Sequence, residues 1–325
     1  MAWSNDGSAW SGRVDTVDGE PGRRWHQVVR PPARHDNGAV ALLGFACDTG
    51  VTRNHGRPGA AGGPRELRRA LANFAWQGGP HAVLLDAGDV TCEGASLEAA
   101  QLEYASHLAN LLRDGHLGVG LGGGHEIAWA AYQGLAQSFA ASPRLERLGI
   151  INFDAHLDIR LPETAGQGTS GTPFLQIAEA RAAAGLPFRY LCIGASETSN
   201  TPALLRRAAS LGADVIYDVE AAARDADGHV RRFVEESSGV YLTFCLDVLP
   251  PDVAPGVSAP SSLGLAPHRA VELLRLVLAG CGHGPRGKLI VADVAELSPR
   301  HDEGGRTARV AARVVYEIAA SWLRG

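Results

Sequence analysis

Short apolar runs alternate along the chain with longer stretches in which apolar residues recur at helical spacing. Continuous runs rich in Val, Ile and Leu are typical of strands buried on both faces, and the spacing between them predicts amphipathic helices. Strands are expected at residues 39–46, 82–88, 117–123, 148–154, 190–194, 213–218, 240–247 and 288–294. Helices are expected at residues 96–115, 126–140, 201–212, 266–280 and 307–325. This alternation predicts an α/β fold with an eight-stranded parallel sheet covered by helices on both faces.

The chain of 325 residues, 45% of them hydrophobic, is large enough for one α/β domain or two smaller ones. The unbroken strand pattern favours a single catalytic domain over residues 36–325. Residues 1–35 are rich in Gly, Pro, Arg and Trp, and we expect an arm that lies over the domain or is partly disordered. Residues 160–172 are too long for an ordinary turn, so we interpret them as a functional loop.

Charge and cysteine content exclude several functional classes. The formal net charge is −5, and the 30 Lys and Arg residues are scattered, which argues against nucleic-acid or membrane partners and favours small polar or acidic metabolites. No targeting or membrane-spanning segment is evident, so a cytoplasmic location is expected, and a homo-oligomer is compatible with this composition. The five cysteines lack any C-x-x-C spacing, which argues against a disulfide framework and predicts mostly free thiols.

Metal-ligand residues follow three of the predicted strands, at the sheet edge where ligands bind in such folds. His125 lies in "GGGHEIAW", where the alternative is a glycine-rich helix entry with an incidental histidine. Asp154, His156 and Asp158 alternate in "NFDAHLDIR", and an extended segment would project all three to one side. The carboxylates of Asp154 and Asp158 would lie close together and repel each other unless a cation were bound between them. This repulsion favours a metal site.

The third strand end is "TFCLDVLP", in which Cys245 and Asp247 share one face by the same alternation. The three edges together supply six donors, which is more than a single tetrahedral ion requires. Two ions about 3.5–4 Å apart that share bridging ligands would use all six, and such a pair activates water for hydrolysis. The sequence therefore predicts a two-metal hydrolytic site.

The segments "GGGHE", "NFDAHLDIR", "CLDVLPPDVAPGVSAP" and "VADVAELSP" resemble the signature segments of the ureohydrolases, the family of arginase, agmatinase and formimidoylglutamase. The resemblance extends from about residue 40 to the end of the chain. It implies a three-layer α/β/α arginase-like fold and two Mn²⁺ ions bridged by hydroxide. Carried over by position, one ion would bind His125, Asp154, Asp158 and Cys245, and the other Asp154, His156, Cys245 and Asp247.

Position 245 departs from the family pattern, which has Asp-x-Asp where this chain has Cys245 and Asp247. Thiolate is a softer ligand than carboxylate and suits Zn²⁺ or Fe²⁺ better than Mn²⁺. The alternative is that Cys245 is an ordinary small buried residue and the metal site is degraded. We also hypothesise that Cys47, directly after the first strand, approaches Cys245 and forms a regulatory disulfide that removes a metal ligand under oxidation.

Other segments resemble the formimidoylglutamase branch of the family. "SGTPF" has Ser170 where the arginase pattern has a histidine, and "RNHGRPGAAGGP" and "PGVSAP" are also similar to that branch. Arg160 directly follows the metal cluster and can clamp a carboxylate with two hydrogen bonds. Further candidates for binding a substrate with carboxylates lie on the loop after the first strand. They are Arg53, Asn54 and Arg57.

The resemblance implies hydrolysis of N-formimidoyl-L-glutamate to L-glutamate and formamide, a late step of histidine breakdown. Glu296 in "VADVAELSP" matches the family glutamate that contacts the amidine nitrogens, and a carboxylate opposite an amidinium would orient the reacting carbon. Because the usual histidine is absent, Asp247 or bound water are the candidates for delivering a proton to the leaving amine.

Three alternatives remain open. An agmatinase or guanidinobutyrase would keep the chemistry and change the substrate. A metal-deficient homologue would act as a scaffold or regulator, with Cys245 as the lesion. A deacetylase with one zinc ion would leave the bridging ligands surplus. The remaining candidate, "CGHG" at residues 281–284, lies at the opposite edge of the sheet and is interpreted as a turn.

Overall fold

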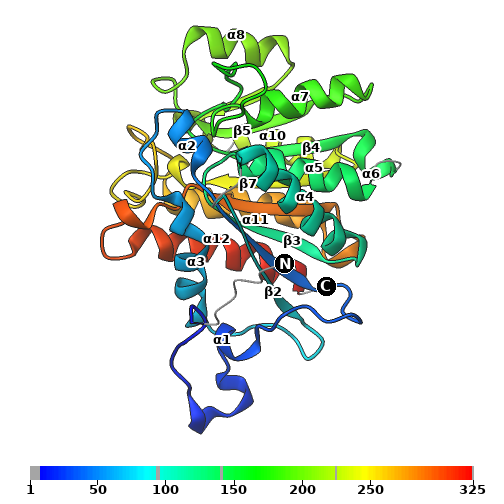
Figure 1. Ribbon diagram of the computed structural model, residues 1–325, viewed down its shortest axis with the longest axis vertical. Helices are drawn as coiled ribbons and strands as arrows, with labels where there is room; N and C mark the ends of the chain where they lie inside the picture. Colours follow the sequence, from blue (N-terminus) through cyan, green and yellow to red (C-terminus); the bar gives the residue numbers. More distant parts are fainter. Residues whose placement is uncertain (1–7, 93–95, 140–141, 224, 324–325) are drawn as a thin grey trace.

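The computed structural model describes residues 8–92, 96–139, 142–223 and 225–323. Its strands form one parallel sheet in the order β2-β1-β3-β8-β7-β4-β5-β6 (Figure 1). The strands are β1 (Val40–Ala46), β2 (Leu84–Thr91), β3 (Leu117–Gly122), β4 (Leu148–Phe153), β5 (Arg189–Ala195), β6 (Asp214–Tyr217), β7 (Gly239–Cys245) and β8 (Leu289–Ala295). All eight lie close to their expected positions, so the predicted eight-stranded parallel sheet is confirmed.

Helices cover both faces of this sheet and complete the three layers. One face carries α3 (Gly63–Ala72), α10 (Asp225–Glu235), α11 (Pro267–Cys281) and α12 (Arg306–Leu323). The other carries α4 (Leu97–Arg113), α5 (Ile127–Phe139), α7 (Pro173–Ala183) and α8 (Pro202–Ser210). Four short helices lie in the connections, namely α1 (Trp25–Val28), α2 (Thr49–Arg53), α6 (Pro143–Glu146) and α9 (Asp218–Ala221).

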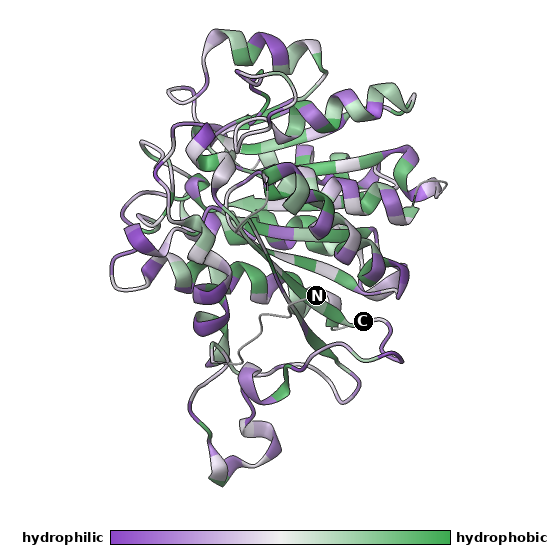
Figure 2. Ribbon diagram, viewed as in Figure 1, coloured by the Kyte–Doolittle hydropathy of each residue, from purple (hydrophilic) through white to green (hydrophobic). Residues whose placement is uncertain are grey.

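Two apolar cores lie between these layers because strand side chains alternate between the faces. In β1, Val40 and Leu42 pack into one core, and Ala41 and Leu43 pack into the other. The strands are accordingly hydrophobic along most of their length, whereas the helices are hydrophobic on one side only (Figure 2). The doubly buried sheet holds its strand ends in fixed positions, and those ends carry the site.

The sequence pattern predicted five of the longer helices and missed α3, α7 and α10. These helices begin with residues that weaken a helical pattern, namely glycine and proline in α3, proline in α7 and the polar stretch "DADGH" in α10. Residues 160–172, which we interpreted as a loop, contain no helix or strand. They end where α7 begins at Pro173.

The N-terminal segment lies beyond the β2 edge of the sheet, at the lower end of the molecule in Figure 1. Its Trp25 is buried against Trp76 and Tyr316. The indole of Trp10 donates a hydrogen bond to Asp86 of β2 at 2.6 Å. Within the described residues, no helix has both the length and the apolar character needed to cross a bilayer.

Candidate active site

A cavity of about 480 Å³ opens at the carboxyl ends of the central strands. The neighbouring strands β3, β8, β7 and β4 end beside one another there. Residues that follow these strands line its floor, and they include His125, His156, Asp247 and Glu296. The sheet order therefore brings together residues that are up to 171 positions apart in the sequence.

The predicted metal ligands converge in this cavity. Candidate ligand atoms of His125, Asp154 and Cys245 lie within 4.8 Å of one another, and so do those of Asp154, His156 and Asp247. Asp158 joins the first group, with Oδ2 at 3.0 Å from His125 Nδ1. Asp154 belongs to both groups, as a bridging ligand would.

The prediction that these side chains share one side because they alternate along extended strands is wrong. β4 ends at Phe153, and the backbone leaves the extended conformation before Asp158, which has a φ of 46°. β7 ends at Cys245, and Asp247 lies in a 3₁₀ turn. The donors meet because β3, β7 and β4 end at the same edge of the sheet, and the segments that follow them leave the extended conformation.

The donor set fits a pair of divalent cations. Imidazole nitrogen and carboxylate oxygen are ligands that such ions accept, and the thiol of Cys245 can also bind metal. Burial raises the pKa of the Cys245 thiol well above its usual value. Although burial alone would raise the pKa of Asp154, hydrogen bonds with His125 and His156 lower it. The cluster is thus a buried, charge-dense site in which a cation would offset repulsion between the acids.

A chain of buried hydrogen bonds fixes the orientation of His125. Its Nδ1 faces the carboxylates, and its Nε2 lies 2.9 Å from Thr243 Oγ1. Thr243 donates to Asp293 Oδ1 at 2.6 Å, and Tyr241 donates to Asp293 Oδ2 at 2.6 Å. Such outer partners typically set the tautomer and rotation of a ligand histidine. We missed these residues because apolar neighbours hide them inside strand patterns.

Glu296 lies beside the metal cluster with one carboxylate oxygen free. Its Oε1 accepts a hydrogen bond from the backbone N–H of His125 at 2.8 Å. Within the described part of the chain, its buried Oε2 has no hydrogen-bond partner. Burial raises the pKa of Glu296 to about 7. An unpaired acceptor at this position can receive an N–H group from a cationic ligand.

Unusual backbone conformations also concentrate in this cavity. Among the described residues, the non-glycine positions with positive φ are His55, Asp158 and Glu296, and all three line it. A positive φ raises the conformational free energy of a residue other than glycine, and such residues are enriched at functional sites. His55 was not predicted from the sequence, which does not reveal its φ.

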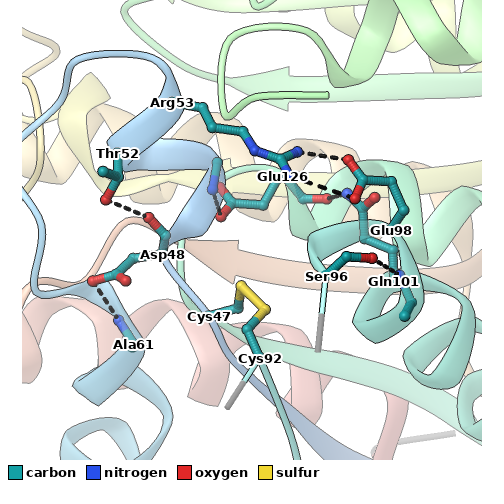
Figure 3. Close-up of a disulfide and its surroundings, with 12 residues drawn as sticks. Cys47, Asp48, Thr52, Arg53, Ala61, Cys92, Ser96, Glu98, Gln101 and Glu126 are labelled. Carbon is teal, nitrogen blue, oxygen red and sulfur yellow. Dashed lines mark hydrogen bonds and ion pairs between the residues drawn. A yellow bond between two sulfur atoms is a disulfide. The ribbon is translucent and has the colours of Figure 1, made fainter. Parts of the chain in front are cut away.

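The predicted disulfide between Cys47 and Cys245 is wrong. Cys47 is bonded to Cys92 with a Cα–Cα distance of 5.3 Å, and Cys245 is a buried free thiol (Figure 3). In the parallel register Ala46 pairs with Thr91, so Cys47 and Cys92 directly follow adjacent strands. Cys245 ends β7, and two strands, β3 and β8, lie between β1 and β7 in the sheet. The error arose because the sequence does not reveal strand order.

The segment between Cys47 and Arg57 forms one wall of the cavity. Gly50 N–H donates to the buried carboxylate of Glu126 at 2.7 Å, and burial raises the pKa of Glu126 to about 8. Arg53 forms an ion pair with Glu98 at 2.6 Å (Figure 3). This wall is therefore attached to α4 through Glu98, to Glu126 directly before α5, and to the end of β2 through the disulfide.

The predicted substrate-binding residues all line the cavity, but most have partners within the protein. Besides its ion pair, Arg53 donates to the carbonyl of Gly168 at 3.0 Å. Arg57 donates to backbone carbonyls, including that of Val257 at 2.5 Å. Asn54 donates to Ser170 Oγ at 3.2 Å, which fixes the position of this hydroxyl. Arg160 differs from Arg53 and Arg57, because its guanidinium has no hydrogen-bond or ion-pair partner among the described residues.

Comparisons with known proteins agree with this arrangement. Formimidoylglutamase of Ralstonia nicotianae is 50% identical over 319 residues, which cover 96% of this chain and 95% of the relative. Formimidoylglutamase of Aromatoleum aromaticum is 47% identical, with 97% and 92% covered. A crystal structure of Trypanosoma cruzi formiminoglutamase with Mn²⁺ matches with a TM-score of 0.76 and 26% identity, covering 87% of this chain and 93% of that one. The model of the arginase family matches residues 38–320, and the chain belongs to this family.

Proposed function

We propose that this protein hydrolyses N-formimidoyl-L-glutamate to L-glutamate and formamide, as a step of histidine breakdown. Water adds to the formimidoyl carbon, the bond from this carbon to the glutamate nitrogen breaks, and the leaving amine takes up a proton. Two full-length relatives named formimidoylglutamase support this substrate. The observation that carries the proposal is a metal-ligand cluster and an unpaired guanidinium, that of Arg160, in one cavity.

The cluster would hold two Mn²⁺ ions, a metal found in the similar T. cruzi structure. His125, Asp154, Asp158 and Cys245 would hold one, and Asp154, His156, Cys245 and Asp247 the other. When bound, such a pair supplies Lewis acidity and activates water near neutral pH. Because Cys245 offers a soft sulfur ligand, the site should also accept Zn²⁺ or Fe²⁺.

Glu296 orients the reacting group. The substrate amidinium is cationic and planar, and the free Oε2 of Glu296 can accept one of its N–H groups. This contact holds the formimidoyl carbon over the cluster and keeps the positive charge that makes the carbon electrophilic. The His125 N–H on Oε1 keeps the Glu296 carboxylate in this orientation.

Arg160 and Ser170 act on the other part of the substrate. Arg160 binds a substrate carboxylate through paired hydrogen bonds, because its guanidinium has no acidic partner among the described residues. Ser170 Oγ is held by Asn54 at the cavity wall, where it can hydrogen-bond the substrate or relay a proton. Asp247 or bound water is the candidate for delivering the proton to the leaving amine.

The proposal is tested by following products directly. The Mn²⁺-loaded, reduced protein is incubated with N-formimidoyl-L-glutamate, and L-glutamate and formamide are measured by proton NMR. Equal amounts of the two products should form, and metal removal or Glu296→Gln should abolish them. Glu303→Gln, on the exposed surface, serves as the control and should leave activity unchanged. Absence of both products from the metal-loaded protein would refute the proposal.

A further inference from the structure

Four arginines line the cavity, and they divide into two pairs by their contacts. Arg53 is neutralised by Glu98, and Arg57 is used by the carbonyls of Pro255, Val257 and Ser258. Arg160 and Arg207 have no acidic partner in the part of the chain that the structure describes. Arg57 has no acidic partner either, but carbonyls occupy its donors, whereas Arg160 and Arg207 keep most of their N–H donors for a ligand.

Arg207 lies in α8, whose first turn forms a wall of the cavity. The lining residues there are Ala203, Leu204 and the N-cap residue Thr201. Arg207 Nη1 donates to the carbonyl of Ile159 at 2.9 Å, and this is the side-chain contact that holds it. Because a guanidinium has five N–H donors, most of them remain for a ligand. The same contact joins Arg207 to Ile159, the residue directly before Arg160.

One further carboxylate, that of Glu163, lines the cavity. Glu163 is exposed, and its carboxylate lies 3.4 Å from His55 Nε2. Among the described residues it forms no ion pair with Arg160 or Arg207. The acids of the metal cluster face one another and the histidines of the cluster. A ligand is therefore the remaining source of negative charge for both arginines.

The strand order places the two arginines at different distances from the reaction centre. The metal cluster lies at the ends of β3, β7 and β4, and Arg160 is two residues beyond Asp158 of that cluster. The helix of Arg207 follows β5, which lies outside β4 in the sheet (Figure 1). Arg207 thus approaches the cavity from the side away from the cluster.

We propose that Arg207 binds the side-chain carboxylate of the substrate and selects dicarboxylates over monocarboxylates. This inference rests on the proposed function. The α-carboxylate is attached to the carbon that bears the formimidoyl nitrogen and lies near the reacting carbon, within the range of Arg160. The side-chain carboxylate is separated from that carbon by two methylene groups and extends toward α8.

The test compares N-formimidoyl-L-glutamate with N-formimidoyl-L-glutamine, which has nearly the same shape but a neutral side chain. The wild-type protein should have the higher kcat/KM for the glutamate derivative. Arg207→Gln should raise the KM for the glutamate derivative by about 10- to 100-fold with little change in kcat. The ratio of kcat/KM for the glutamate derivative to that for the glutamine derivative should fall by the same factor in this variant. Arg207→Lys, which keeps the positive charge, should retain part of the preference for the glutamate derivative.

Arg206→Gln is the matched control, since Arg206 is the exposed neighbour of Arg207 in the same helix. It should leave KM, kcat and the preference unchanged. Circular dichroism and thermal unfolding of all variants establish that each is folded. Wild-type selectivity in a folded Arg207→Gln variant would overturn the inference while leaving the proposed function intact.

A binding measurement separates the two proposals. Isothermal titration calorimetry with N-formyl-L-glutamate and N-formyl-L-glutamine, whose formyl groups lack the amidine, reports on the carboxylate subsite without turnover. Wild-type protein should bind the glutamate form more tightly, and Arg207→Gln should lose that difference. If Arg207→Gln loses the difference in affinity between the two formyl compounds but the wild-type protein hydrolyses no N-formimidoyl-L-glutamate, the role of Arg207 in carboxylate binding is supported and the proposed reaction is refuted. If the difference persists in the variant, the inference fails.

Discussion

Cys245 is the residue on which the metal site depends most. The family pattern has a carboxylate at this bridging position, yet the thiol is buried and lies with His125 and Asp154 in the cluster. Burial raises the thiol pKa, so an empty site holds neutral sulfur, and a nearby cation would favour the thiolate. Cys245 should therefore bind metal as a thiolate and not act merely as a small core residue.

Variants at position 245 test this role. Cys245→Asp restores a carboxylate ligand and should retain activity and two bound Mn²⁺ per chain. Cys245→Ala removes the ligand and should lower metal affinity and activity by on the order of 100-fold or more. Metal content by mass spectrometry and product formation give the two readouts, and Cys281→Ala, which removes a buried free thiol at the end of α11, is the control. Equal metal content and activity in all variants would exclude Cys245 from the site.

Thr243 supports the site from behind His125. Thr243→Val keeps the shape and removes the hydroxyl that bridges His125 Nε2 and Asp293. We expect Mn²⁺ affinity to fall by about 10- to 100-fold, since outer partners of ligand histidines contribute that much. Thr243→Ser should restore most of the affinity in the same titration. If Thr243→Val binds Mn²⁺ like the wild type, the hydrogen-bond chain has no role in metal binding.

At the scale of elements, the site is a set of turns at the ends of rigid strands. Gly123 precedes the His125 turn, and a Cβ there would lie 2.0 Å from the carbonyl oxygen of Cys47 and 2.5 Å from that of Phe45. Both atoms are backbone of the neighbouring segment, so they cannot rotate away. The close approach of β1 to this turn requires glycine.

Two glycine substitutions test this packing. Gly123→Ala should destabilise the fold by about 1–3 kcal/mol and displace His125, which would lower metal affinity. Gly228→Ala in α10 has open space around the added methyl and should be neutral or stabilise by up to about 1 kcal/mol. Urea unfolding measures both changes. Equal stability of the two variants would show that the β1 contact is not tight.

Most of the sheet could be predicted from the sequence because doubly buried strands produce continuous apolar runs. The strand-end positions of His125, Asp154 and Asp247 followed from that pattern. The turn that carries Asp247 and the positive φ of Asp158 could not be predicted, because they depend on tertiary contacts. Arg207 was missed for a similar reason, since an arginine in an amphipathic helix resembles a solvated surface residue.

At the scale of the whole molecule, strand order determines which residues meet. It places Cys47 beside Cys92 and separates both from Cys245, which the sequence alone could not reveal. The N-terminal segment joins the sheet through a buried network, in which Arg68 binds Asp86 at 2.8 Å and Trp10 donates to the same carboxylate. The edge strand β2 is thereby tied to α3 and to the N-terminal segment.

This network makes stability depend on pH. Burial alone would raise the pKa of Asp86, but Arg68 lowers it below the usual value of 3.8. The contribution of Asp86 is therefore full at pH values well above 3.8 and is lost as pH falls through the lower native pKa. Asp86→Asn should cost at most about 3–5 kcal/mol at pH 7, because it removes one of the two carboxylates, those of Asp86 and Asp89, that pair with the buried guanidinium of Arg68.

The check is urea unfolding of wild type and Asp86→Asn at pH 7 and at pH 3. The difference in unfolding free energy should shrink at the lower pH, because Asp86 of the unfolded wild type takes up a proton there. Asp225→Asn, in an exposed position at the start of α10, is the control and should show little difference at either pH. A constant difference for Asp86→Asn across this range would argue against an ionised Asp86 in the native state.

The central claim is that this cavity combines a two-metal cluster with arginines that select a formimidoyl dicarboxylate. The most direct measurement is kcat/KM for N-formimidoyl-L-glutamate and for agmatine with the same Mn²⁺-loaded protein. We predict a ratio of at least about 10³ in favour of N-formimidoyl-L-glutamate, because agmatine leaves Arg160 and Arg207 without partners. A similar or higher value for agmatine would contradict this account.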